Sequence, residues 1–200
     1  MPKIGIIVGS TRPGRKADAV ARWVHDAAVQ RTDAEYALVD IADYGLPLLD
    51  EPLPPMTGRY TKSHTRAWAD TVGALDGFVF VTPEYNHSTS AALKNAIDFL
   101  YAEWCNKAAG FVSYGATGGT RAVEHLRLVM AELQVADVRA QVSLSLRTDF
   151  TGYKELTPHP AQQQVLSEVL DQVVAWSTVL NPLRTPNVVD SVDHTMGARS

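Results

Sequence analysis

The sequence predicts a doubly wound α/β fold, in which five parallel strands lie in the order 2-1-3-4-5 with helices on both faces of the sheet. Short apolar runs rich in β-branched residues alternate with longer segments whose apolar residues recur at helical spacing. Such alternation forms a parallel sheet, and right-handed crossovers leave two common strand orders. Five strands favour 2-1-3-4-5 over the six-stranded order of dinucleotide-binding proteins.

The first half of the chain supplies two strands and two helices. Residues 4–8 form a β-branched apolar run, as expected of a strand that is buried on both faces. Apolar residues at helical spacing follow over 17–28, and residues 36–39 indicate the second strand. Four prolines predict a loop over 41–60, and a helix is expected over 64–75.

The middle of the chain carries the clearest helix. A third strand over 78–81 is ended by Pro83, which cannot donate a backbone hydrogen bond. Apolar residues then share one helical face from Leu93 to Trp104, and Ser88 or Thr89 is placed to cap this helix.

The second half repeats the pattern. Residues 109–112 indicate a fourth strand, and glycines 115, 118 and 119 indicate a turn. A helix over 126–133, a fifth strand over 138–146 and a last helix over 166–173 follow. We expect one domain over residues 1–180, and an extension or mobile tail over 181–200.

Composition narrows the function classes. The net charge of −4 gives no basic field for nucleic acid. No apolar stretch is long enough to cross a bilayer, and the N-terminus lacks the pattern of a signal peptide. The single cysteine, Cys105, cannot form an intrachain disulfide and suits a cytoplasmic protein. The six histidines show no metal-ligand spacing, so no metal site is expected.

The loop after the first strand has the chemistry of an anion site. Residues 9–17, which we call the phosphate loop, join a buried strand to the N-terminus of a helix, where backbone N–H groups attract anions. Ser10 and Thr11 add hydroxyl donors, and Arg12, Arg15 and Lys16 add three cations. A phosphate monoester would match this loop. It lacks both the Gly-Lys-Ser/Thr ending of a P-loop and the G-x-G-x-x-G of a dinucleotide fold.

A second polar loop follows the third strand, where ligands of such sheets bind. Tyr85 offers an aromatic face with a polar tip, and Asn86 offers amide donors and an acceptor. Their backbone N–H groups can reach the edge of a planar heterocycle. Together these residues favour a second part of the same binding site.

Four segments make the sequence recognisable. They are Gly9-Ser10-Thr11-Arg12, Pro83-Glu84-Tyr85-Asn86, Leu93-Lys94-Asn95-Ala96-Ile97-Asp98, and Val112-Ser113-Tyr114-Gly115 with Gly118-Gly119. Through them the chain resembles the NADPH-dependent FMN reductase family, a flavodoxin-like group that includes quinone, chromate and azo-dye reductases. The resemblance covers about residues 3–180.

The resemblance implies roles for individual residues. The FMN phosphate would be held by Ser10, Arg12, Arg15, Lys16 and Ala17. The isoalloxazine ring would be lined by Pro83, Glu84, Tyr85 and Asn86, and its other side closed by Ser113, Tyr114, Gly115 and Gly118. One departure stands out: many relatives carry a second Ser and an Asn in the phosphate loop, where this chain has Gly14-Arg15-Lys16.

The resemblance also implies an activity. NADPH, or NADH, would give hydride to N5 of bound FMN, and a quinone, a flavin or a similar small acceptor would then take the electrons in a ping-pong cycle. The flavin carries this chemistry, so no side chain is expected to be catalytic. Family members are commonly homodimers, and a homotetramer is also possible. The aromatic residues Tyr44, Tyr60, Tyr101 and Trp104 could supply an interface.

Two alternatives stay open at this point. A Rossmann dehydrogenase would use the phosphate loop and Asp40, which ends the second strand where such folds carry a ribose-binding acid. It leaves Pro83-Glu84-Tyr85-Asn86 unexplained. A non-enzymatic flavodoxin-type electron carrier would bind FMN but oxidise NADPH slowly, and it would depend on a more acidic surface than −4 provides.

Overall fold

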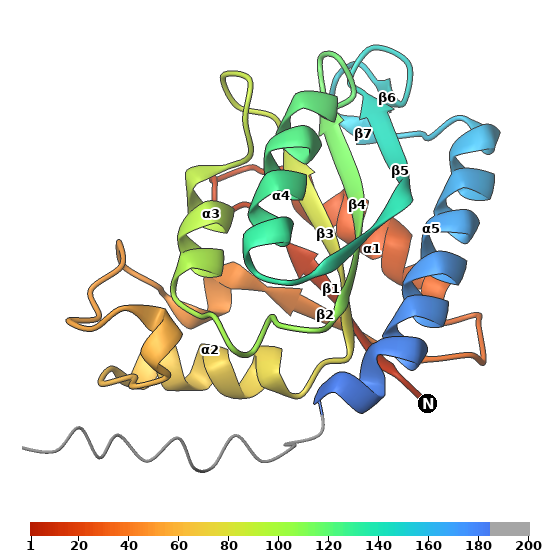
Figure 1. Cartoon of the computed structure of the whole chain (residues 1–200). Coiled ribbons are helices and arrows are strands. Elements are labelled where there is room, and N and C mark those ends of the chain that lie inside the picture. Colours follow the sequence, from red (N-terminus) through yellow and green to blue (C-terminus); the bar gives the residue numbers. More distant parts are fainter. Residues whose placement is uncertain (185–200) are drawn as a thin grey trace, which may run out of the picture.

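The computed structural model describes residues 1–184 and has a parallel five-stranded sheet at its centre (Figure 1). The strands are β1 (Lys3–Val8), β2 (Glu35–Asp40), β3 (Gly77–Pro83), β4 (Ala108–Gly115) and β5 (Ala136–Ser145). Their order is β2-β1-β3-β4-β5, which confirms the predicted order. The order reverses between β1 and β3, so the carboxyl ends of these strands border the crevice where ligands bind.

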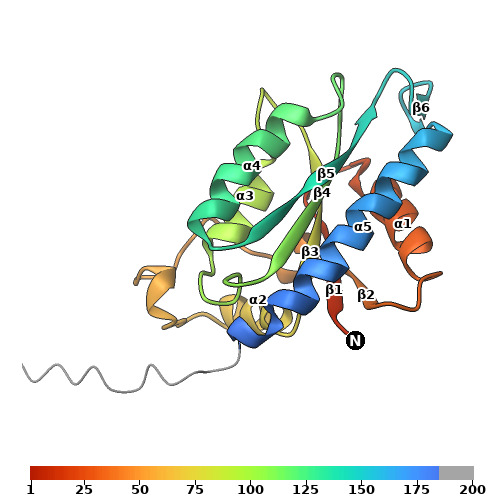
Figure 2. The same ribbon diagram turned by 45° about the vertical axis from the view of Figure 1, so that its right-hand side comes forward.

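Helices cover both faces of the sheet (Figures 1 and 2). One face carries α1 (Ala17–Ala28) and α5 (Pro160–Leu180). The other face carries α2 (Ser63–Gly73), α3 (Ala91–Asp98) and α4 (Thr120–Glu132). The layers follow from the strand pattern, because neighbouring residues of a strand point to opposite faces. Ile6 and Val8 pack toward α1, while Ile7 between them packs against the second layer.

The helix after β3 is shorter than predicted. It ends at Asp98, and residues 101–106 form turns, so the predicted extension to Trp104 is wrong. Trp104 is fully buried, and its indole nitrogen donates to the carbonyl of Ile97 at 3.1 Å. A turn thus presents this apolar residue to the same core that a helix would. The cap is Ser90, whose Oγ accepts from the amide of Leu93 at 3.0 Å, rather than Ser88 or Thr89.

The aromatic residues that could supply an interface are largely engaged within the chain. Trp68 packs edge-on against both Tyr44 and Trp104. The Tyr60 hydroxyl donates to Glu103 at 2.7 Å, and the Tyr101 hydroxyl reaches the Glu132 carbonyl at 3.5 Å. Trp104 therefore belongs to the core, and these residues give no independent support for a dimer.

Several short elements were not predicted. The proline-rich segment contains the 3-10 turns Ile41–Tyr44 and Pro55–Thr57, and β6 (Phe150–Thr151) pairs with β7 (Glu155–Leu156) between β5 and α5. Residues 181–184 form a further 3-10 turn, held by an ion pair between Arg184 and Asp76 at 2.7 Å. The rest of the predicted tail, 185–200, lies outside the described residues.

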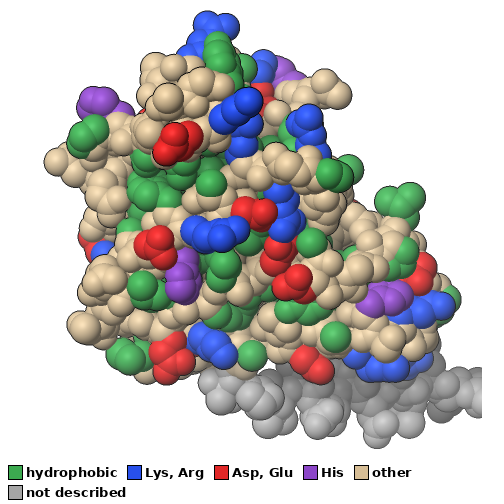
Figure 3. All heavy atoms as spheres, turned by 180° about the vertical axis from the view of Figure 1, so that it is seen from behind, with side chains coloured by type: hydrophobic (Ala, Val, Ile, Leu, Met, Phe, Trp, Pro, Cys, Tyr) green, Lys and Arg blue, Asp and Glu red, His purple; other side chains and the backbone are tan. Residues whose placement is uncertain are grey.

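The described surface carries charges of both signs. Acidic and basic side chains are interspersed across the face seen from behind (Figure 3). Among residues 1–184, no helix combines the length and the hydropathy needed to span a bilayer.

Candidate functional site

A pocket of about 320 Å³ lies where the carboxyl ends of β1, β3 and β4 meet. Parallel strands direct the loops that follow them to one edge of the sheet, so three segments far apart in the sequence converge there. Its lining residues are Arg12, Gly14, Arg15, Lys16, Pro83, Glu84, Tyr85, Tyr114, Gly115, Ala116 and Leu146. Eight of the thirteen predicted site residues line the pocket directly: Arg12, Arg15, Lys16, Pro83, Glu84, Tyr85, Tyr114 and Gly115.

The phosphate loop is anchored to the neighbouring strand and helix. The amide of Gly9 donates to the carbonyl of Val81 at 2.8 Å, and the Ser90 hydroxyl donates to the Gly9 carbonyl at 2.6 Å. A Cβ on Gly9 would lie 2.5 Å from the Val81 carbonyl oxygen, so only glycine permits this approach. The buried Ser10 follows directly, with its Oγ 3.4 Å from the Tyr85 hydroxyl.

The start of α1 is open to an anion. The residue before the helix, Lys16, makes no side-chain cap, and the helix begins at the fully buried Ala17. First-turn N–H groups of a helix lack intrahelical partners, and the helix dipole makes this end positive. The N-terminus of α1 therefore has the geometry and polarity of a phosphate site.

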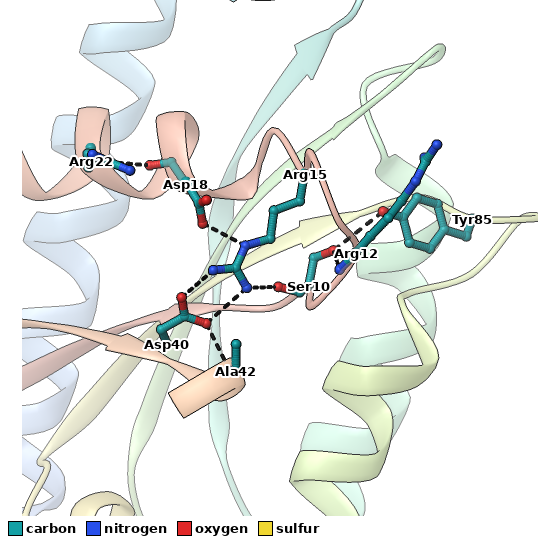
Figure 4. A network of polar contacts seen from close by, with 8 residues as sticks. All are labelled: Ser10, Arg12, Arg15, Asp18, Arg22, Asp40, Ala42 and Tyr85. Carbon is teal, nitrogen blue, oxygen red and sulfur yellow. Dashed lines mark hydrogen bonds and ion pairs between the residues drawn. The ribbon is translucent and has the colours of Figure 1, made fainter. Parts of the chain in front are cut away.

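Arg15 is held by acidic partners instead of extending freely toward the pocket (Figure 4). Its guanidinium makes a two-point ion pair with Asp40, with an Nη1–Oδ1 distance of 3.0 Å, and its Nε lies 2.7 Å from Asp18. It also donates to the carbonyl of Ser10. Burial alone would lower the pKa of Arg15, but the two carboxylates outweigh it and raise the pKa. Most of its charge is thus already compensated.

Within residues 1–184, the other two cations of the loop, Arg12 and Lys16, are not held by ion pairs of the kind that Arg15 makes. The guanidinium of the exposed Arg12 lies 5.9 Å from the centre of the Tyr85 ring, a cation–π distance (Figure 4). Lys16 is partly exposed at the rim. These two side chains, with the α1 N-terminus, provide the positive charge available to a bound phosphate.

The loop after β3 is a tight turn. Tyr85 and Ser88 exchange two backbone hydrogen bonds, of 2.9 and 3.1 Å, and the intervening Asn86 and His87 both have positive φ. This is the pattern of a type I′ hairpin turn, and Asn and His are among the non-glycine residues that most often adopt a positive φ. The turn keeps Tyr85 at the pocket and carries Asn86 to its tip.

An ion pair joins this loop to α4. Glu84, whose side chain is only 5% exposed, pairs with Arg121 and also accepts from the Arg121 amide at 3.2 Å. Arg121 in turn reaches Nδ1 of His87 at 3.2 Å. Glu84 is predicted to line the ring, and within the described residues its carboxylate contacts Arg121. Sequence reasoning missed Arg121, although its place just after Gly118-Gly119 at a helix start was a signal.

The loop after β4 closes the third side. Ser113 is buried and donates to the carbonyl of Gly118 at 2.7 Å, so it shapes the loop from inside. Gly119 has a φ of +75°, and a Cβ there would lie 2.8 Å from that of Ser113. Tyr114 contributes a buried hydroxyl that has no hydrogen-bond partner within the described chain.

These features fit FMN. The open start of α1, two available cations and an orphaned buried hydroxyl suit a phosphate, which only accepts hydrogen bonds when it is ionised. The loops after β3 and β4 supply an aromatic ring and glycine-rich backbone for a planar heterocycle. A ribose-binding role for Asp40 fits poorly, because Arg15 and the amide of Ala42 already occupy its carboxylate.

A larger pocket of about 560 Å³ lies at the opposite edge of the sheet. The cations that line this pocket are engaged by other parts of the chain. Lys107 donates to the carbonyls of Val72 and Gly73 at the end of α2, and Arg184 pairs with Asp76. The carboxyl edge therefore remains the candidate site.

Comparisons with known proteins converge on one family. The model of the NADPH-dependent FMN reductase family matches residues 2–149. An NAD(P)H-dependent FMN reductase of Schizosaccharomyces pombe is 41% identical over 150 residues, which cover 74% of this chain and 75% of that one. A quinone reductase of Escherichia coli is 35% identical over 133 residues, covering 64% and 68% of the two chains.

Solved structures share the fold. A flavoenzyme NAD(P)H:(acceptor) oxidoreductase from Paracoccus denitrificans superimposes with a TM-score of 0.70 at 20% identity, covering 90% of this chain and 98% of that one.

Proposed function

Because the chain belongs to the NADPH-dependent FMN reductase family, we propose that it binds FMN and passes electrons from NADPH, or NADH, to a small acceptor such as a quinone or a flavin. One observation carries the proposal: the phosphate loop and the loops after β3 and β4 line a single pocket at the carboxyl edge of the sheet. The five-stranded order removes the Rossmann dehydrogenase alternative, which requires the six-stranded order.

The phosphate loop would bind the cofactor's phosphate. In this proposal Ser10 and Ala17 present the loop and helix backbone, and Arg12 and Lys16 supply charge. Arg15 would act mainly by holding the loop in shape, since its guanidinium contacts Asp18, Asp40 and the Ser10 carbonyl.

The other two loops would position the ring. Pro83, Glu84, Tyr85 and Asn86 would line one side, and Ser113, Tyr114, Gly115 and Gly118 the other. When bound, FMN would supply the redox chemistry, which is the transfer of two electrons from the nicotinamide to the acceptor. With a quinone the balance is NADPH, a proton and quinone giving NADP⁺ and hydroquinone. The chain's own part is to orient the reactants, and no side chain is assigned as acid or base.

Donor and acceptor would use the same site in turn, which is a ping-pong cycle. A quinone acceptor is favoured by the relatives named as quinone reductases. We also propose a cytoplasmic homodimer or homotetramer. The segment between β2 and α2 offers an exposed apolar surface for such contacts, at Leu48, Leu49, Leu53 and Met56.

The absorption spectrum of the purified protein tests the proposal. We expect a flavin band, present as purified or after adding FMN, that bleaches on anaerobic addition of NADPH and returns with quinone. Rapid bleaching with multiple turnovers also separates a reductase from an electron carrier, which would oxidise NADPH slowly. A protein that neither takes up FMN nor oxidises NADPH would refute it.

A further inference from the structure

One buried polar atom at the pocket has no partner within the fold. The Tyr114 side chain is 5% exposed, and its hydroxyl makes no hydrogen bond within the described residues. Leaving a buried hydroxyl unpaired costs free energy, so such an atom in a native protein needs an explanation. Because Tyr114 lines the pocket, a ligand can supply the missing partner.

The side chain points toward the phosphate loop. Tyr114 packs in the same core layer as Val8 and Ala17, on the α1 face of the sheet, and its ring lies 6.4 Å from that of Phe150. The hydroxyl of Tyr114 is therefore directed to the start of α1, where an anion would sit.

The surroundings make this hydroxyl a donor. Burial, and then the nearby Tyr85, raise the pKa of Tyr114, so the proton is retained at neutral pH. Arg15 and the amide of Ala17 act in the opposite direction, although the amide makes no hydrogen bond of acceptable geometry with the hydroxyl. These positive groups face the phenolic oxygen and leave its proton for an acceptor in the pocket.

We propose that the Tyr114 hydroxyl donates a hydrogen bond to the phosphate of FMN. This inference rests on the proposed function and refines it, because the family resemblance places Tyr114 against the ring. A phosphate offers only acceptor oxygens when it is ionised, and its charge strengthens a hydrogen bond from a neutral donor. Tyr114 thereby joins β4 to a site otherwise built from β1 and α1.

The test compares FMN with riboflavin, which lacks the phosphate. Both are titrated into wild-type protein and Tyr114→Phe, and binding is followed by flavin fluorescence. We expect Tyr114→Phe to bind FMN about 10- to 100-fold more weakly, the effect of one hydrogen bond to a charged acceptor, and riboflavin within about twofold of wild type.

Urea unfolding of the flavin-free proteins supplies an independent readout. Tyr114→Phe removes an unpaired hydroxyl, so the free protein should be at least as stable as wild type. Tyr36→Phe is the matched control: its hydroxyl donates to Asp33 at 3.0 Å on the far side of β1. We expect this control to lose stability but keep its FMN affinity, the opposite pattern.

Three results would overturn the assignment. Unchanged FMN affinity in Tyr114→Phe would show that the hydroxyl makes no hydrogen bond to the phosphate. Equal losses of affinity for FMN and riboflavin would place the hydroxyl against the ribityl chain or the ring. A flavin-free Tyr114→Phe protein that is clearly less stable would show a structural partner instead. If wild-type protein binds no FMN, the proposed function fails as well. If wild-type protein binds FMN and only the Tyr114→Phe result differs from expectation, the assignment of Tyr114 fails alone.

Discussion

Arg15 and Asp40 form a two-point ion pair that ties the phosphate loop to the end of β2 (Figure 4). The two residues are 25 positions apart, and both side chains are less than a quarter exposed. The ion pair thereby fixes the position of the phosphate loop relative to β2. It also uses the acid that a dinucleotide-binding fold would direct to a ribose.

The first prediction concerns this pair. Arg15→Met and Asp40→Asn should each destabilise the flavin-free protein, and a double-mutant cycle should give a coupling energy of about 1 kcal/mol, since the pair is partly buried. Urea unfolding measures the four proteins. A coupling energy indistinguishable from zero would mean that the pair does not fix the loop.

The second prediction concerns the available cations. Arg12→Ala and Lys16→Ala should each weaken FMN binding roughly 3- to 10-fold and leave riboflavin binding almost unchanged, because their charge acts on the phosphate. The effect should shrink at high salt. Arg22→Ala, an exposed change further along α1, is the control. If Arg22→Ala lost as much FMN affinity as the other two variants, the cations would act through a general electrostatic field and not at a specific phosphate site.

The third prediction concerns the pair that joins the loop after β3 to α4. Arg121→Met leaves the nearly buried Glu84 carboxylate without its cation, whereas Glu84→Gln leaves a half-exposed guanidinium that water can solvate. Arg121→Met should therefore cost about 1 kcal/mol more in unfolding free energy than Glu84→Gln. Arg59→Met, at an exposed arginine, controls for the loss of charge alone. Equal costs would contradict this asymmetry.

The fourth prediction concerns pH and the buried Lys107. Burial, followed by the charge of Arg184, lowers the pKa of Lys107 to about 8. The unfolded state, with an ordinary lysine pKa near 10.4, binds more protons between these values, so stability should rise with pH across this window. Below pH 8 both states are charged and the full penalty is present.

Lys107→Met isolates this contribution. From pH 7 to pH 10, wild-type stability should rise relative to the variant by up to about 2–3 kcal/mol, measured by urea unfolding at both pH values. The lost hydrogen bonds to Val72 and Gly73 add an offset that does not titrate. A stability difference that stays constant with pH would show that the lysine is not appreciably desolvated.

Local patterns predicted most of the fold. The apolar runs of β1 and β3 and the spaced residues of α1 identify their elements, because helical and strand periodicities are properties of neighbouring residues. Trp104 shows where this reasoning fails: its spacing continues the face of α3, but the chain turns after Asp98 and still buries the indole. Burial demands an apolar residue and does not specify how the backbone delivers it.

The sequence by itself determined the sheet order and the three loops that meet at its carboxyl edge, since the strand–helix alternation and right-handed crossovers leave few arrangements. Only the tertiary structure decided which side chains are available in those loops. Arg12, Arg15 and Lys16 are alike in the sequence, yet Asp40 and Asp18 engage one of them. Tyr114 likewise becomes an orphaned donor only once its side chain packs in the same core layer as Ala17, at the start of α1. The partners of a charged or polar group depend on distances across the fold, which local periodicity does not encode.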